Sequence, residues 1–157
     1  MTKEMILPLF DSRFQKEVAF MPLMDAINDL TAEQASWQPS NEGHSIWQIV
    51  NHLIFWNSLM LNQLQKKPQE QTNVDNDNTF EMPENTSDAA WQKTIEQIHS
   101  IFKEMQDAVS QLDDSRFDEV IEADGTTLKF HLGHTATHDS YHIGQITYIR
   151  KLQGITR

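Results

Sequence analysis

The chain has 157 residues, which suits one domain spanning residues 1–157, and it has no cysteine, which excludes disulfides, zinc–thiolate sites and cysteine nucleophiles. Lysine and arginine total 12 against 23 aspartate and glutamate, and the formal charge of -11 argues against nucleic acid and anionic membranes as partners. The N-terminus lacks the pattern of a signal peptide, and no run is long enough to span a membrane, so we expect a cytoplasmic protein.

A first helix is predicted from about residue 7 to residue 30, where apolar residues recur at steps of three and four. Its apolar face comprises Leu7, Phe10, Phe14, Val18, Met21, Met24 and Ile27. Because Pro22 falls inside this run, the helix either kinks or restarts there. A loop is predicted over residues 31–44, where proline, serine, asparagine and glycine cluster.

A second helix is predicted over residues 46–66, with Ser45 as its N-cap. Its core stripe consists of Ile46, Ile49, Leu53, Trp56, Met60 and Leu64. The polar, acidic connection that follows, residues 68–86, is longer than most loops between antiparallel helices. It is expected to be either a crossover connection or a flap over a site.

The third helix has the most regular pattern in the chain. Its apolar positions alternate steps of four and three without interruption: Trp91, Ile95, Ile98, Phe102, Met105, Val109 and Leu112. Such a seam is typical of a helical bundle or coiled coil. Ser87 or Asp88 is expected to cap the start of this helix.

A fourth helix is predicted over residues 127–153, after a tight turn at Asp124 and Gly125, and Gly154 ends it. Four long helices without a convincing alternating strand predict an all-α fold. We therefore expect a four-helix bundle with a long connection between its second and third helices.

The fourth predicted helix carries four of the chain's seven histidines on one face. Steps of three and four place them, together with a glutamine, in a single stripe: His131, His134, His138, His142 and Gln145. Residues four apart on a helix are close enough for both imidazoles to bind one ion, as in helical zinc proteases. Binding costs little entropy because the helix already holds the two rings.

A metal site needs a ligand from a second helix, because zinc takes four ligands when structural and three plus a water when catalytic. His52 is the best candidate, since it borders the core stripe of the second predicted helix. His44, in a loop, and His99, beside an apolar seam, are poorer candidates. The alternative is a set of core histidines with hydrogen-bond partners, although clustered buried imidazoles are costly.

Three stretches of the sequence resemble the DinB/YfiT-like family, four-helix bundles described as metal-dependent hydrolases or thiol transferases. Residues 37–39 and 43–47 resemble the family's entry to its second helix, and residues 51–57 resemble its first metal-ligand segment. Residues 134–146 resemble its last segment, with the characteristic His-x-x-x-His-x-Gly-Gln. The order and spacing of the three stretches cover nearly the whole chain.

The resemblance implies that His52, His138 and His142 are the ligands of one divalent transition-metal ion. Zinc or nickel is the usual ion of such sites, with one to three positions left for water or substrate. The resemblance identifies no catalytic group beyond the metal.

The resemblance also implies roles for residues beside the ligands. His134 would lie behind the ligands or in the core without contacting the ion, and Asp139 would orient an imidazole. Gln145 would lie near the site, and Gly144 would let two helices approach closely.

Three hypotheses of function remain open. The first is an enzyme in which the ion activates water or holds the thiolate of a small-molecule thiol, which must be a cosubstrate because the chain has no cysteine. The second is a non-catalytic metal-binding or stress protein in which the ion cross-links two helices. The third is a metal-free bundle that binds a small molecule in a polar histidine core.

A homodimer is also predicted, because bundles of this size often pair through their helices. Apolar residues off the main stripes would supply the contact surface. They are Phe20, Ile54, Phe55 and Tyr148.

Overall fold

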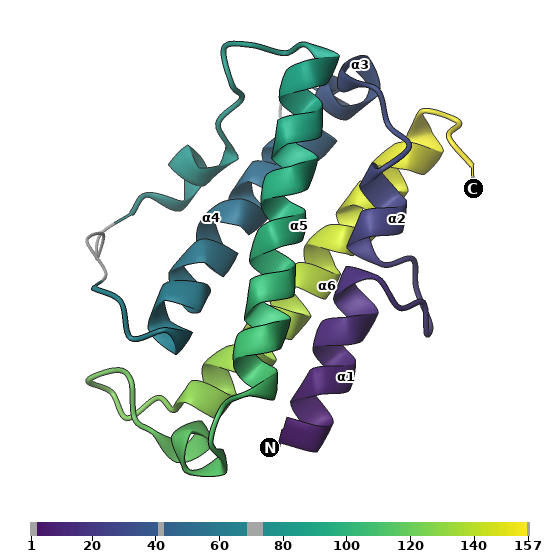
Figure 1. The fold of residues 1–157 in the computed structure, drawn as a ribbon. Helices are drawn as coiled ribbons and strands as arrows, with labels where there is room; N and C mark the ends of the chain where they lie inside the picture. Colours follow the sequence, from purple (N-terminus) through teal and green to yellow (C-terminus); the bar gives the residue numbers. More distant parts are fainter. Residues whose placement is uncertain (1–2, 41–42, 69–73, 157) are drawn as a thin grey trace.

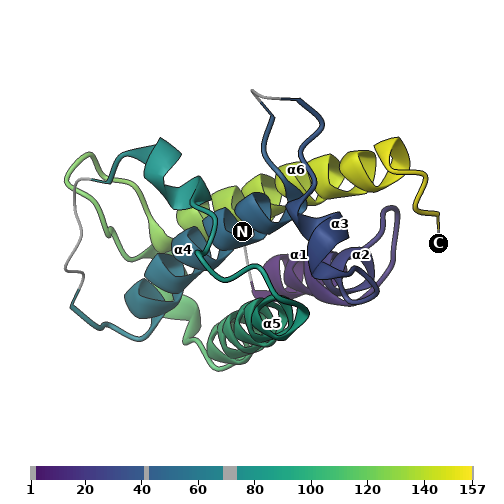
Figure 2. The same ribbon diagram turned by 90° about the horizontal axis from the view of Figure 1, so that it is seen from above.

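The computed structural model describes residues 3–40, 43–68 and 74–156. Four long helices form a bundle over this part of the chain (Figure 1): α1 (Lys3–Phe14), α4 (Ile46–Leu64), α5 (Asp88–Ser110) and α6 (Leu128–Leu152). α4 and α1 each pack against both α5 and α6, and Figure 2 shows them lying between those two helices. The prediction of an all-α four-helix bundle is confirmed.

The long connection between α4 and α5 follows from the direction of the helices. α4 and α5 run in the same direction in Figure 1, whereas α1 and α6 run in the opposite one. The chain must therefore return along the length of α4 before α5 can begin. The described part of this return includes the 3₁₀ helix η1 (Asn76–Phe80), which packs against α4.

The expectation of a helix over residues 7–30 is wrong between Phe14 and Pro22, whereas the alternative that the helix restarts at Pro22 is confirmed. α1 ends at Phe14, and a separate short helix, α2 (Leu23–Ile27), begins after Pro22. Val18, expected on the buried face, is 69% exposed. α2 packs against α6, as α1 does, and a proline is suited to the start of a helix because it fixes φ and lacks a backbone N–H.

The expectation of a loop over residues 31–44 is also wrong in part, because α3 (Ala32–Ser36) lies within it. Thr31 and Gln34 form a capping box, in which each side chain bonds the backbone N–H of the other residue. Ala32 and Ala35 are buried where α3 packs against α4 and α5. The proline and glycine that indicated a loop all come after this helix.

The core of α5 agrees with the sequence pattern, and so does that of α4 except at Trp56, which is only partly buried and lines a pocket. Ser45 and Ser87 cap the two helices through their hydroxyl groups, and every residue of the predicted seam from Trp91 to Leu112 is buried. The indole rings of Trp47 and Trp91 pack together at 5.0 Å and join the two helices. Within the described ranges, no helix is both long and apolar enough to cross a membrane.

The segment before α6 sets the start of the histidine-bearing helix. A second 3₁₀ helix, η2 (Asp114–Asp118), is followed by a turn in which Gly125 has a φ of 91°, a conformation that favours glycine. An isolated bridge between Val120 and Thr127 closes the turn. α6 then runs without interruption to Leu152, and Gly154, with a φ of 72°, lies just beyond its end.

Candidate metal centre

α4 and α6 bring three histidines together at the middle of the bundle. One ring nitrogen from each of His52, His138 and His142 lies within 4.8 Å of the other two. The Nε2 atoms of His52 and His138 are 3.1 Å apart. His52 and His142 are buried, whereas the His138 side chain is 24% exposed, so the cluster reaches solvent on the side of His138.

The tautomer of His52 follows from a hydrogen bond with η1. Its Nδ1 lies 2.6 Å from the hydroxyl oxygen of Thr79, and that hydroxyl donates its single proton to the carbonyl oxygen of Asn76 at 2.6 Å. The hydroxyl must therefore accept from His52, which places the imidazole proton on Nδ1. Nε2 is left with a free lone pair that faces the cluster.

The other two rings are held in the same way. Nδ1 of His142 donates to the amide oxygen of Gln145 at 2.7 Å, and the amide nitrogen of Gln145 donates to the Tyr141 hydroxyl at 3.1 Å. Nδ1 of His138 lies 3.4 Å from a carboxylate oxygen of Asp139. A partner on each Nδ1 leaves each Nε2 as the nitrogen available to an ion, which is the arrangement common to metal-binding histidines.

The electrostatic environment favours the neutral form of His52 and of His142. The pKa of His52 is lowered from 6.5 to about 3, chiefly by burial and in addition by the neighbouring imidazoles of His142 and His138, against the opposing effect of Asp139. Burial also lowers the pKa of His142, although its bond to Gln145 works in the other direction. Metal ions bind the neutral ring, so these shifts favour metal binding over protonation.

The donor set fits a transition-metal ion. The Nδ1 atoms of His52 and His138 each have another partner, so the Nε2 atoms of these two rings, 3.1 Å apart, present lone pairs to each other. This arrangement is unfavourable unless a cation lies near both Nε2 atoms. Two imidazole nitrogens about 2.1 Å from one ion lie roughly 3.0 to 3.4 Å apart, depending on the angle between them. The observed separation falls in that range, and imidazole ligands suit zinc, nickel, copper and iron.

A buried polar network lies behind His138 and was not found from the sequence. Asp139 accepts a hydrogen bond from the Asn57 amide at 3.0 Å and forms an ion pair with Arg13 of α1. The Arg13 guanidinium lies between the rings of Phe10 and Phe102, 4.1 Å from each centroid. The helical period placed Arg13 beside an apolar stripe, and only the packing of α1 against α6 shows its partner.

η1 supplies two further residues that the sequence did not single out. The first is Thr79, described above. The second is Phe80, whose ring stacks on that of His52 with centroids 4.0 Å apart, and His44 stacks on Phe80, also at 4.0 Å. The amide of Asn51 donates to the carbonyl oxygen of Glu81 at 2.8 Å and holds the end of η1 against α4. The described part of the long connection therefore covers the His52 side of the cluster, as the flap hypothesis expected.

Several other expectations differ from the structure. His134 is exposed, so it is not a core residue, and its ring centroid lies 6.1 Å from that of His138. Gly144 is exposed, and a Cβ atom added there would meet nothing within 4 Å, so no close helix approach depends on it. His99, by contrast, agrees with its expectation as a poorer ligand candidate, because it lies on the outside of α5 against Phe14 and apart from the cluster.

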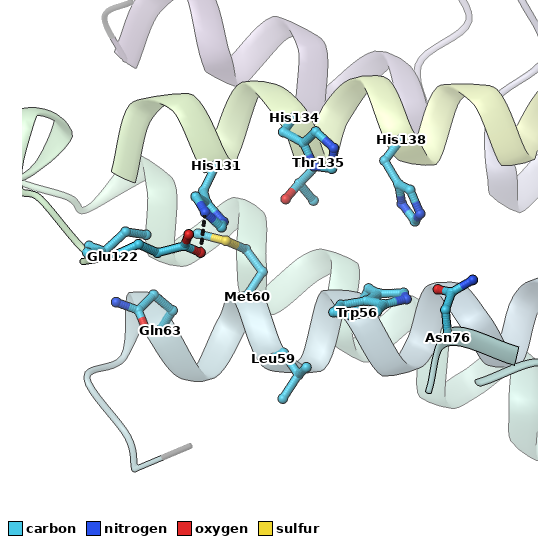
Figure 3. A pocket seen from close by; sticks show the side chains of 11 residues that line it. Trp56, Leu59, Met60, Gln63, Asn76, Glu122, His131, His134, Thr135 and His138 are labelled. Atoms are coloured by element: carbon cyan, nitrogen blue, oxygen red, sulfur yellow. Dashed lines mark ion pairs between the residues drawn. The ribbon is translucent and has the colours of Figure 1, made fainter. Parts of the chain in front are cut away.

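A pocket of about 480 Å³ opens beside the cluster, between α4 and α6. Figure 3 shows His131, His134 and His138 along its α6 wall, facing Trp56 and Met60 of α4. His138 therefore belongs both to the cluster and to the pocket. At the other end of the pocket, His131 forms an ion pair with Glu122 at 2.8 Å.

The fold and the site define a class of protein: a four-helix bundle with a three-histidine cluster between two of its helices, open to a pocket on one side. The chain belongs to the DinB superfamily, whose family model matches residues 17–146. This match confirms the family that the sequence motifs indicated.

A solved structure supports the same fold. YfiT from Bacillus subtilis, described as a probable metal-dependent hydrolase with an unusual four-helix bundle topology, matches with a TM-score of 0.74 and 18% sequence identity. The match covers 98% of this chain and 89% of that one. At this identity the likeness shows the fold alone. The comparison with curated proteins gave no match.

Proposed function

We propose that this protein is a metal-dependent enzyme that holds one divalent transition-metal ion with His52, His138 and His142. It acts on a small molecule, either as a hydrolase or as a transferase that uses a low-molecular-weight thiol. The observation that carries this proposal is the convergence of three histidine ring nitrogens at the edge of a pocket. Zinc or nickel is the expected ion.

The arrangement favours a catalytic site over a purely structural one. A structural zinc site is closed by four protein ligands, whereas a catalytic site has three and keeps a position open. In the described part of the chain the cluster offers three ligands, and His138 borders the pocket. YfiT, which shares the fold, is itself described as a probable metal-dependent hydrolase.

The chain's own residues prepare the site for such chemistry. Thr79 and Gln145 fix the tautomers of His52 and His142, and Phe80 excludes water from one face of His52. A divalent ion held by three neutral imidazoles keeps its full charge, and so it supplies a Lewis acid that acidifies water or a thiol and polarises a carbonyl. The pocket would hold the substrate beside His138.

Elemental mass spectrometry on untagged protein is the first test. We expect about one ion per chain in the wild type and in His134→Ala, because His134 is exposed and outside the cluster. His52→Ala, His138→Ala and His142→Ala should each lose the ion. Wild-type protein without an ion, even after incubation with zinc and nickel, would leave the histidines as core and pocket residues and would end the proposal.

A cobalt-substituted protein separates catalytic from structural binding. If the ion has an open position, adding 2-mercaptoethanol should produce a thiolate-to-cobalt charge-transfer band, and acetohydroxamate should alter the visible spectrum. A structural ion in a closed shell would respond to neither ligand, and this result would favour the non-catalytic metal-binding protein instead.

We also propose that the chain forms a homodimer through apolar residues outside the core. Tyr148 is exposed, Phe20 is partly so, and Ile54 and Phe55 are half-buried on α4. Light scattering at high protein concentration should report twice the monomer mass, and Tyr148→Asp should shift it toward the monomer. A monomeric wild type at that concentration would exclude this assembly.

A further inference from the structure

The pocket beside His138 has an apolar middle and two polar ends of different chemistry. Four apolar side chains from α4 and the turn before α6 line it: Trp56, Leu59, Met60 and Ile121. Its far end is polar and is formed by the ion pair between Glu122 and His131 (Figure 3). An occupant therefore meets the candidate metal centre at one end, an apolar wall in the middle and a carboxylate at the other end.

The charges of the pocket are unbalanced. Among the described residues that line it, Glu122 is the one carboxylate, and there is no lysine or arginine. His131 contacts Glu122 at 2.8 Å, and the Glu122 side chain is 49% exposed, so its carboxylate stays accessible at this end of the pocket. The chain as a whole has a formal charge of -11, which adds to the attraction of cations and the repulsion of anions.

The length of the pocket follows from the helix that forms its wall. His131 and His138 are seven residues apart on α6, which corresponds to about 10 Å along the helix axis at 1.5 Å per residue. Both side chains point toward α4 in Figure 3. A molecule that reaches from one to the other is elongated, with room for an aromatic ring or a short alkyl chain against Trp56 and Met60.

We infer that this pocket is the substrate site and that it selects an elongated organic amine, whose ammonium group binds Glu122 while its apolar middle packs against Trp56 and Met60. The inference rests on the proposed function only where it places the reacting end of the molecule at His138. Because no lysine or arginine is among the described residues that line the pocket, a substrate with an anionic group at the Glu122 end is disfavoured. The pocket would therefore distinguish an amine substrate from a carboxylic acid of the same length.

Two matched probes test the charge selection without the metal: 4-phenylbutylamine and 4-phenylbutyrate. They have nearly the same length and differ in the charge at one end. Their binding to chelator-treated, full-length protein is measured at pH 8 and moderate salt, from the NMR shifts of the Met60 and Leu59 methyl groups. We expect the amine to bind about five- to tenfold more tightly, the range for a partly exposed ion pair set against a repulsion.

Variants then locate the preference. Glu122→Gln should remove the difference between the two probes, and Glu122→Lys should reverse it. Glu96→Gln is the matched control, because Glu96 is exposed on α5 outside the pocket lining and its loss changes the net charge equally. Glu122 is half-exposed, so its substitution leaves the core intact.

The outcomes distinguish this inference from the proposed function. Equal or tighter binding of 4-phenylbutyrate, no shift of the pocket methyl groups, or an equal loss of preference in Glu96→Gln would each overturn the selection of an amine. Metal content is measured separately, and so an ion-free protein that still prefers the amine would retain the pocket assignment while the enzyme proposal fails. A protein that binds the metal but shows no preference between the two probes would support the enzyme proposal and overturn the selection of an amine.

Discussion

The guanidinium group of Arg13 and the carboxylate of Asp139 form an ion pair that is almost completely buried, although 126 residues separate them in the chain. Asp139 follows His138 directly in the chain. The carboxylate oxygen that does not contact Arg13 lies 3.4 Å from Nδ1 of the His138 ring. The pair therefore connects α1 to the candidate metal centre on α6. Asn57 completes the connection from α4 by bonding both partners.

Breaking this pair should be strongly destabilising. Asp139→Asn leaves a buried guanidinium without its counter-ion, and we expect a loss of about 3 to 5 kcal/mol in the free energy of unfolding. Arg13→Met should cost a similar amount, because it leaves the carboxylate unpaired. Urea unfolding of the two single variants and of the double variant measures the coupling, and the double variant should lose less than the sum.

The exposed pair between Lys103 and Asp107 on α5 is the control for this experiment. Its removal by Lys103→Ala should change the free energy of unfolding by less than about 1 kcal/mol, as is usual for surface pairs. A loss of similar size at both pairs would mean that the burial of Arg13 and Asp139 has no energetic consequence.

The hydrogen bond between Thr79 and His52 should tune metal affinity. Thr79→Val removes the acceptor for Nδ1–H but keeps the shape of the side chain, and such changes typically lower metal affinity by about 10- to 100-fold. Thr79→Ser should restore most of the affinity, because the hydroxyl returns. Competition with a chromophoric chelator gives the dissociation constants, with Thr86→Val at an exposed position as the control. Unchanged metal affinity in Thr79→Val would show that the hydrogen bond to Thr79 does not determine the tautomer of His52.

Without metal, the stability of the protein should depend on pH through His52. Its pKa is about 3 in the folded chain and 6.5 as the ordinary value, so the unfolded chain binds the proton first as the pH falls. This contribution to stability is complete above about pH 6.5 and is lost progressively toward pH 3, with a slope of up to about 1.4 kcal/mol per pH unit.

The comparison is made by urea unfolding of chelator-treated wild type and His52→Gln between pH 7.5 and pH 5. The variant has no ring to protonate at this position, and so its free energy of unfolding should change less with pH. Identical slopes for the two proteins would contradict the lowered pKa of His52.

Removing the ion should lower the melting temperature. An ion that binds only the folded chain stabilises it by about 2.7 kcal/mol when its free concentration is 100 times the dissociation constant. Calorimetry with and without a chelator should therefore show a shift in the wild type, and none in His142→Ala. A chelator-induced shift that persisted in His142→Ala would place the ion elsewhere.

The sequence patterns were most informative where local spacing decides the structure. The seam from Trp91 to Leu112 and the caps Ser45 and Ser87 follow from side-chain periodicity and backbone hydrogen bonding within one helix. The pattern was misleading between Phe14 and Pro22, because α1 and α2 share a helical period although the chain between them is not helical. The prediction of a loop over residues 31–44 rested on the proline and glycine that follow α3, and it did not consider the capping-box pair Thr31 and Gln34.

What the sequence alone determined is the position of α4, α5 and α6, the family motif and the histidine pair of α6, since residues four apart on one helix are neighbours in any fold. Only the tertiary structure decided what surrounds that pair. It brings His52 from α4 to within hydrogen-bonding distance of His138, sets Thr79 against His52, and buries Arg13 beside Asp139. These contacts join residues between 27 and 126 positions apart, and such distances in the chain are bridged by the packing of helices, which no local pattern encodes.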